Sequence, residues 1–288
     1  MGADELLEAA ERPWLEEGRI DEGRRTLAEL LDRAGEDAPA ASRARALTTA
    51  GVLAFRAGDT DAATSAHLQA LELARVAGDR EAEARAHGGL ARVALRAGDF
   101  DDTRRHAEAA VAIWGELGDE QSLARQLHLL PYIDYMRGND DAARAGFEES
   151  LELARRYGEE FLVVAELTNL GSVETRAGNL DRALSLCREA LALASELQSA
   201  YALPYCVVNL GGVASARGDH EAAARILGAG KAMFDRTGAA IDPGTAIEFE
   251  RHVERTRSAL GDGFEAAWNF GYELDEEHAI AAASAYGP

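Results

Sequence analysis

The stretch RAGDF, residues 96–100, returns along the chain with small changes. Near copies are RAGDT at 56–60, RGND at 137–140, RAGNL at 176–180 and RGDH at 217–220. Their glycines recur with a 40-residue period, and one more step back adds a sixth, giving Gly18, Gly58, Gly98, Gly138, Gly178 and Gly218. A second series keeps the same step, with Gln198 as its exception: Gly78, Gly118, Gly158 and Gly238. A fixed period of this length predicts a solenoid of repeated units.

Each period contains two helical patterns, which residues 164–197 show clearly. In the first pattern, apolar residues recur at three-residue steps, at Val164, Leu167, Leu170 and Val173. Gly178 then ends the first helix, because glycine adopts the left-handed conformation without a Cβ clash. Asn179 or Asp181 is placed to cap a second helix, whose apolar stripe is Ala183, Leu186, Cys187, Ala190, Leu191 and Ala194. The glycine and the polar residue after it therefore predict the turn of a helical hairpin.

The acidic runs at 98–102 and 138–141 resemble carboxylate metal sites. They also stand where each repeat needs a helix stop and acidic residues in the next first turn, so we interpret them as structural. The seven histidines show no zinc-ligand spacing, and no nucleophile-elbow motif occurs. We therefore expect no catalytic residue, no metal, no cofactor and no enzymatic activity. A helical enzyme using carboxylates such as Asp101 and Asp102 is the opposing alternative.

Small residues recur on both sides of the turn glycines. Seven positions before the glycine stand Gly51, Ala91, Gly171 and Gly211, and five after it stand Ala63, Ala143, Ala183 and Ala223. This pattern resembles the tetratricopeptide repeat, in which two helices cross closely at small residues. The resemblance implies an all-α, right-handed superhelical solenoid of about six helical hairpins with a C-terminal helical cap. We expect six 40-residue repeats over residues 1–240, the first divergent, and capping helices over 241–288.

Three longer segments carry a narrower resemblance. They are EEGRIDEGRRTLAELL at 16–31, AARILGAGKAMFDRTGA at 223–239 and ALGDGFEAAWNFGYELDEEHAI at 259–280. Together with the repeats they resemble the C-terminal sensor arm of bacterial STAND-class ATPase and LuxR-type transcriptional regulators. The chain has neither a phosphate-binding loop nor a basic DNA-reading helix. The resemblance therefore implies a fragment of such a regulator or a free-standing relative.

Composition and charge restrict the partners. The 288 residues are 47% hydrophobic and carry a formal net charge of −21. Such a surface repels nucleic acids and acidic membranes, so we expect neither as a direct partner. No apolar run is long enough to span a membrane, and the N-terminus is unlike a secretory signal. With only Cys187 and Cys206, both expected to be reduced and buried, a cytoplasmic protein is predicted.

A basic ladder is the first candidate binding surface. Arg45, Arg85 and Arg125 follow the same 40-residue period on the expected inner faces of successive first helices, and Arg92 lies further along the same face. A basic lining in an acidic protein suits carboxylate or phosphate groups. The alternative is that these arginines pair with glutamates such as Glu81 and Glu83, or cover the solvent face.

Two asparagines supply a further candidate. Asn169 and Asn209 are also separated by one full period, and in similar repeats an asparagine here holds the backbone of a bound peptide. The alternative is a side chain that ties neighbouring helices together.

One irregular helix supplies the last candidate. Pro131 replaces the small residue of the fourth repeat in mid-helix, where proline frees the carbonyl of Leu127 and kinks the helix. We expect His128, Tyr132 and Tyr135 to form a pocket at this kink, the alternative being a tolerated kink with core tyrosines.

These observations predict a non-catalytic module that binds a protein or peptide segment, acidic or amide-rich, or a small effector. They favour the sensor arm of a signalling or transcriptional regulator. The alternative is a free-standing assembly scaffold that joins proteins through its convex or end surfaces.

Overall fold

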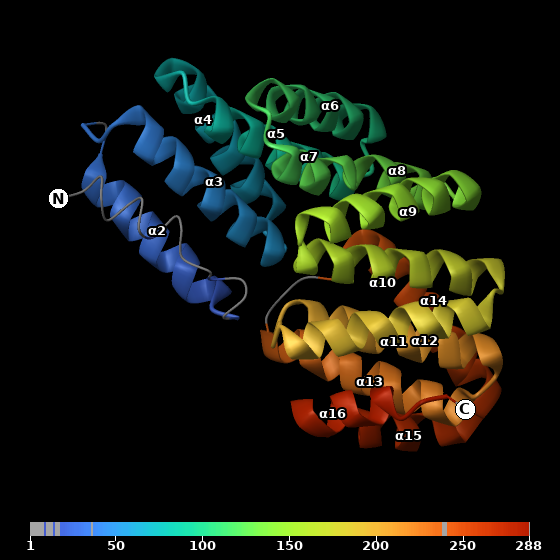
Figure 1. Ribbon diagram of the computed structural model, residues 1–288. Helices are drawn as coiled ribbons and strands as arrows, with labels where there is room; N and C mark the ends of the chain where they lie inside the picture. Colours follow the sequence, from blue (N-terminus) through green and yellow to red (C-terminus); the bar gives the residue numbers. More distant parts are fainter. Residues whose placement is uncertain (1–8, 10–13, 15–17, 36, 238–240, 288) are drawn as a thin grey trace. The chain divides into compact units, whose positions relative to one another are not determined.

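The computed structural model describes residues 9, 14, 18–35, 37–237 and 241–287, and its regular structure there is entirely helical (Figure 1). The predicted all-α solenoid class is confirmed. The chain separates into two compact units, Met1–Ile133 and Asp134–Pro288. Gly238 and most of the expected first helix of repeat one lie outside the described residues. The boundary expected at residue 240 stays a prediction.

Unit 1 consists of antiparallel helical neighbours. Its helices are α2 (Ile20–Ala34), α3 (Ala40–Arg56), α4 (Thr60–Ala77), α5 (Arg80–Ala97), α6 (Phe100–Leu117) and α7 (Glu120–Leu127). Helix α8 (Leu129–Met136) crosses the boundary between the units.

Unit 2 continues the same alternation. Its helices are α9 (Asp140–Tyr157), α10 (Glu160–Ala177), α11 (Leu180–Glu196), α12 (Ala202–Arg217), α13 (His220–Thr237), α14 (Pro243–Leu260), α15 (Phe264–Tyr272) and α16 (Glu276–Ser284). A 3₁₀ turn, η1 (Gly261–Gly263), joins α14 to α15.

The register glycines adopt the backbone conformation that the sequence predicted. Those described have φ between 67° and 88°: Gly18, Gly58, Gly78, Gly98, Gly118, Gly138, Gly158, Gly178 and Gly218. Gln198, the exception in the sequence series, has φ 50° and keeps the same turn despite its Cβ. The 40-residue period is therefore a period of helix-ending turns.

At four turns, all in unit 1, the aspartate after the turn glycine caps the following helix. The side chains of Asp59, Asp79, Asp99 and Asp119 each accept a backbone N–H in the first turn. Asn179 occupies the cap position of α11 without such a bond, and its amide donates to Glu174 Oε2 instead. Asn179, one of the two expected cap residues, therefore stands at the N-cap position without the expected capping bond, while the acidic runs serve as helix starts.

In four hairpins a small residue of the first helix packs against the residue sixteen positions later, whereas repeat four has Pro131 at the small position. A Cβ built on Gly51 would lie 2.6 Å from the His67 ring, and one on Gly171 would lie 2.5 Å from Cys187 Sγ. In repeat three the two positions are Ala91 and Ala107, both fully buried. The helices therefore cross so closely that the two side chains share one small volume.

Arginines of the repeated motif join neighbouring hairpins. Arg96 donates to the carbonyl of Phe55, and its guanidinium lies 3.5 Å from the centre of that ring. Arg176 repeats the arrangement two periods later: it donates to the carbonyl of Tyr135 at 3.1 Å and lies 4.3 Å from its ring centre. These arginines therefore hold the preceding turn, in addition to facing a helix C-terminus.

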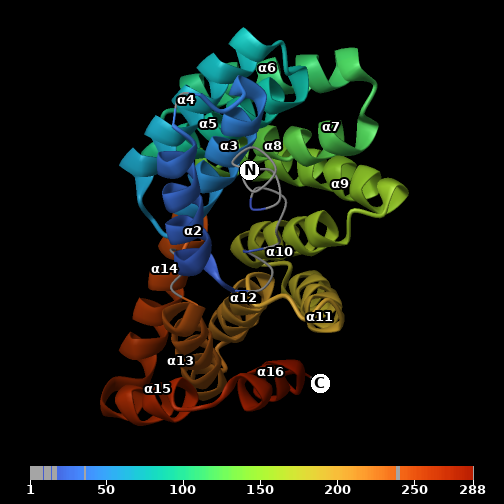
Figure 2. The ribbon, with the colours of Figure 1, turned by 90° about the vertical axis from the view of Figure 1, so that its left-hand side faces the viewer.

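Contacts between residues about one period apart continue past residue 240. A Cβ on Gly212 would lie 2.9 Å from the His252 ring, and Thr256 donates to Ser215 Oγ at 2.9 Å. Likewise, a Cβ on Gly228 would clash with the carbonyl oxygen of Trp268. Helix α14 thus lies beside α12 as a first helix would, and α15 lies beside α13. Helices α15 and α16 lie at the end of unit 2 (Figures 1 and 2).

The first helix of repeat four is interrupted at His128, near the position at which Pro131 predicts a kink. Helix α7 ends at Leu127, His128 is its C-cap, and α8 begins at Leu129. Pro131 has no N–H to donate to the Leu127 carbonyl, which accounts for the break.

In the described part of the chain, no helix has both the length and the apolar character needed to cross a bilayer.

The close crossing predicts that the effect of Gly171→Ala on stability changes sign with the residue at position 187. Gly171→Ala places a Cβ against the buried Cys187 thiol, so we expect it to destabilise the protein by about 1–2 kcal/mol, despite a helix-propensity gain of about 1 kcal/mol. In a Cys187→Ala background, which reproduces the natural Ala91/Ala107 pair, Gly171→Ala is expected to stabilise. Urea denaturation of the four proteins measures both effects. The same sign in both backgrounds would contradict the shared-volume account.

Candidate functional site

The arginine ladder is engaged in ion pairs in unit 1. Arg45 Nε donates to Asp79 Oδ2 at 3.0 Å, and Arg85 donates to Glu81 at 2.6 Å. Arg125 is exposed on α7 and acts electrostatically on the carboxylate of Asp119. The side chains of Arg45 and Arg85 remain 41% and 55% exposed. Arg45 and Arg85 therefore pair with carboxylates of the same unit, and ligand binding by the ladder stays a prediction.

Arg92 belongs to a more buried environment. Burial, followed by the positive charge of Arg92, lowers the pKa of His67 to about 4 and that of His128 to about 3. Arg92 and His128, both predicted site residues, are therefore close enough to interact electrostatically, and both histidines are neutral at pH 7.

The two tyrosines of the pocket predicted at the kink fall in different units. Tyr132 is half-buried on α8 in unit 1, whereas Tyr135 falls in unit 2 and is 4% exposed. The Tyr135 ring lies edge-on to Phe147 and under the Arg176 guanidinium, and its hydroxyl forms a hydrogen bond with Ser172. Tyr135 thus packs as a core tyrosine whose hydroxyl reaches the polar groups of α10.

Asn169 is used internally. Its amide donates to Glu166 Oε2 at 3.1 Å, and Ser150 of α9 donates to the other carboxyl oxygen at 2.5 Å. Glu166 is completely buried, and burial raises its pKa to about 8 against the opposing effect of these two hydrogen bonds. The bond of Asn169 to Glu166 lies within α10, and Ser150 ties α9 to α10 through the same carboxyl group. Ligand binding by Asn169 stays a prediction.

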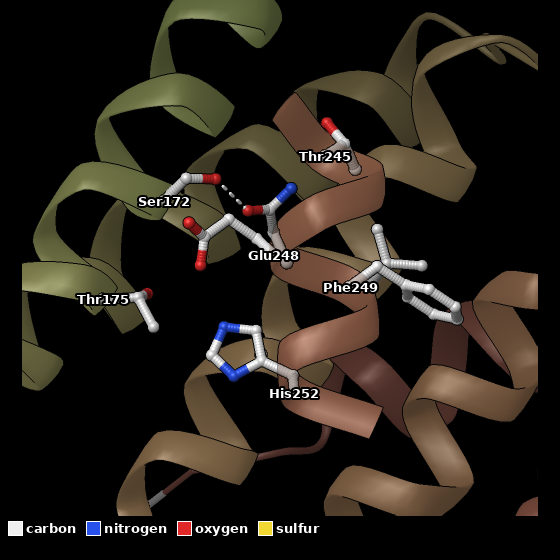
Figure 3. Close-up of a pocket in the computed structure, with 9 residues that line it drawn as sticks. Ser172, Thr175, Thr245, Glu248, Phe249 and His252 are labelled. Carbon is white, nitrogen blue, oxygen red and sulfur yellow. Dashed lines mark hydrogen bonds between the residues drawn. The ribbon is translucent and has the colours of Figure 1, made fainter. Parts of the chain in front are cut away.

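Asn209 is one of the residues that line a pocket between α10, α12 and α14, and Figure 3 shows this pocket. Its Nδ2 donates to the Tyr205 carbonyl at 2.9 Å, and its Oδ1 accepts from Ser172 at 2.5 Å. The pocket is lined by Ser172 and Thr175 of α10, by Val208, Asn209 and Gly212 of α12, and by Thr245, Glu248, Phe249 and His252 of α14. In Figure 3, Ser172 and Thr175 face Glu248 and His252 across this space.

The carboxylate of the pocket is paired with arginines that lie outside its lining. Glu248, on its wall, pairs with Arg251 at 2.7 Å and with Arg176 at 3.4 Å. Arg176 also pairs with Asp140. Burial lowers the pKa of His252 to about 4, so its imidazole is neutral at pH 7. Glu248 is therefore the one carboxylate among the residues that line the pocket, and the positive charges of Arg255 and Arg251 act on the neutral His252 ring.

The 40-residue register relates this pocket to residues that the sequence did single out. Ser172, Gly212 and His252 occupy the register position of Arg92 and Tyr132, and Thr245 occupies that of the arginine ladder. Sequence reasoning missed Glu248 and His252 because the glycine series ends before α14. Extending the same step beyond residue 240 would have found them.

Other reactive groups form separate clusters. In unit 1, His87 Nδ1 and His106 Nδ1 are 2.8 Å apart, and burial lowers the pKa of both rings. Cys187 and Cys206 are buried free thiols whose pKa burial raises. Among the described residues, no group of three or more histidine, cysteine, aspartate or glutamate side chains is placed to hold a metal ion.

Comparison with known proteins gives one family. Residues 42–116 and 163–234, just over half of the 288 residues, match the model of the tetratricopeptide repeat. Fifty-five chains of solved structures match. One of these is the crystal structure of BtubC (BKLC) from P. vanneervenii, 21% identical over 94% of this chain and 93% of that chain, with a TM-score of 0.49. At these values, the likeness supports no inference about this chain. No curated protein matches it.

The buried Glu166 predicts a pH dependence of stability. Its pKa rises from 4.5 to about 8 on folding, so between these values the folded state retains a proton that the unfolded state loses. The free energy of unfolding is therefore expected to fall as pH rises through this window, by a few kcal/mol for this group.

Glu166→Gln supplies a permanently neutral group of the same shape, and should remove that loss. The measurement is the difference in urea stability between wild type and variant from pH 5 to pH 8. Taking the difference cancels the opposite contribution of the buried histidines. A difference that does not change with pH would show that Glu166 is ionised in the folded protein.

Proposed function

Because the chain belongs to the tetratricopeptide-repeat family, we propose that it is a non-catalytic module that binds a segment of another protein along its first helices. The proposal is supported by one observation above all. Helices α10, α12 and α14 lie in one register and present polar groups to a shared pocket. A surface that combines an apolar wall with a few convergent polar groups is typical of a recognition site.

The finer role is part of the same proposal. We propose that the module is the sensor arm of a signalling or transcriptional regulator of the cytoplasm, as its resemblance to such arms implies. In unit 1, the exposed guanidiniums of Arg45 and Arg85 would exchange their present carboxylates for those of an acidic segment. Charge complementarity of this kind has a larger effect on the specificity and the association rate of a complex than on its affinity.

A second candidate function has its own observation. Exposed apolar side chains lie on the second helices of unit 1, where Val76 of α4 is 76% exposed and Leu117 of α6 is 46% exposed. Leu68 of α4 is 51% exposed. These residues favour the scaffold alternative, in which partners dock on second helices.

A blocking substitution distinguishes the two functions. Thr245→Arg adds a long charged side chain at the pocket of α14, and Ser185→Arg adds the same group to the exposed face of α11, a second helix. Peptides are first selected on the wild-type protein by random-peptide display. These peptides are expected to bind the wild-type protein with a Kd of about 1–100 µM. Thr245→Arg should lower their affinity by at least about tenfold, whereas Ser185→Arg should leave it unchanged.

The measurement is isothermal titration calorimetry of the selected peptides with all three proteins. Loss with Ser185→Arg and not with Thr245→Arg would favour the scaffold. Failure to select any peptide on the folded protein would overturn the proposal that first helices bind extended segments.

A further inference from the structure

We propose that the pocket between α10, α12 and α14 recognises an uncharged carboxamide, as carried by an asparagine or glutamine side chain of the bound segment. The inference rests on the proposed function, since it names the chemistry of that same surface. It is carried by the hydrogen-bonding groups that the pocket leaves unused.

His252 is the central group. His252 is 8% exposed, and Figure 3 shows its Nε2 on the ring edge that faces Glu248 and Ser172, whereas its buried Nδ1, which has no hydrogen-bond partner among the described residues, lies on the opposite edge. A neutral imidazole has one N–H donor and one acceptor nitrogen. Nε2 is therefore the imidazole nitrogen that a ligand in the pocket can reach, and a ligand that supplies a hydrogen-bond partner for it is favoured over an apolar one.

The neighbouring groups add both kinds of hydrogen bond. Ser172 donates its hydrogen to Asn209, and its oxygen keeps an acceptor lone pair even where Tyr135 occupies the other. Thr175 donates to the carbonyl of Gly171, so its oxygen is also left as an acceptor. The Asn209 amide donates one hydrogen to Tyr205 and retains a second. A carboxamide offers two N–H donors and one carbonyl acceptor, which matches this mixed set.

The charges around the pocket disfavour a charged ligand. Glu248 already faces Arg176 and Arg251, so an ammonium group would compete with two guanidiniums for one carboxylate. A carboxylate ligand would in turn meet Glu248. A buried charge without its own counter-charge loses more hydration than it regains, whereas an amide needs only hydrogen bonds.

The size of the pocket limits the ligand to the tip of a side chain. The space open to the centre of a water molecule is about 20 Å³, and one water needs at least about 10–15 Å³. Gly212 forms part of the floor, where a Cβ would meet the His252 ring. Val208 and Phe249 are the apolar side chains of the lining, and in Figure 3 the Phe249 ring is directed away from Ser172 and Thr175.

The experiment uses capped single residues as probes, so it needs no selected peptide. N-acetyl-glutamine methylamide is titrated into the full chain with ¹⁵N-labelled histidine side chains, and the His252 ring signals are followed by NMR. The matched probes are the glutamate, lysine and leucine derivatives. A side-chain tip of this size is expected to bind in the millimolar range, so titration extends to about 0.2 M.

We expect a saturable shift of the His252 signals with the glutamine probe and at least about fivefold weaker binding of the other three. Ser172→Ala should weaken the binding of the glutamine probe. In His252→Phe, which keeps a buried ring, saturable shifts of backbone amides around the pocket should be lost. His67, buried in unit 1, serves as the internal control and should not shift.

Equal shifts with all four probes, or no saturation with the glutamine probe, would overturn the carboxamide assignment. Either result would leave peptide binding to first helices untouched, because that function is tested by the blocking substitution in α14. Conversely, a selective glutamine shift together with failed peptide selection would confine the ligand to small carboxamides.

Discussion

The structure depends on how closely the two helices of each hairpin cross. In four of the repeats, a first helix carries a glycine or alanine at one position, and the residue sixteen positions later fills the space left above it. Gly51 receives His67, and Gly211 receives Leu227, whose side chain a Cβ would approach to 2.8 Å. Since close-packed interiors resist added volume, this contact fixes the spacing of the two helices. The stacking of hairpins, and the side chains that the first helices present, follow from that spacing.

Much of the fold could be predicted from the sequence because its signals are local. A turn glycine and an aspartate cap act within a few residues, so their 40-residue recurrence was readable directly. Gln198 shows the limit, since it adopts the left-handed turn without being glycine. The turn persists there because the flanking helices α11 and α12 are held by their neighbours, a tertiary effect that local sequence does not display.

The candidate site was only partly predictable for a related reason. The register placed Asn209 on the correct face, but the hydrogen bonds of its amide to Ser172 and Tyr205 depend on distances that no spacing rule gives. Glu248 and His252 lie on a helix whose turn glycine is missing from the series. Their position follows from packing, because Gly212 admits the His252 ring between α12 and α14. Asn169 likewise has a contact that the spacing did not predict, since its amide donates to the buried Glu166.

The central claim is that first helices, extended by α14, form the binding surface of this chain. Hydrogen–deuterium exchange of the full chain, with and without a selected peptide, tests it most directly. The account predicts that added protection falls on α10, α12 and α14 and leaves α11, α13 and α15 unchanged. Protection confined to second helices, or to α15 and α16 at the end of unit 2, would contradict it.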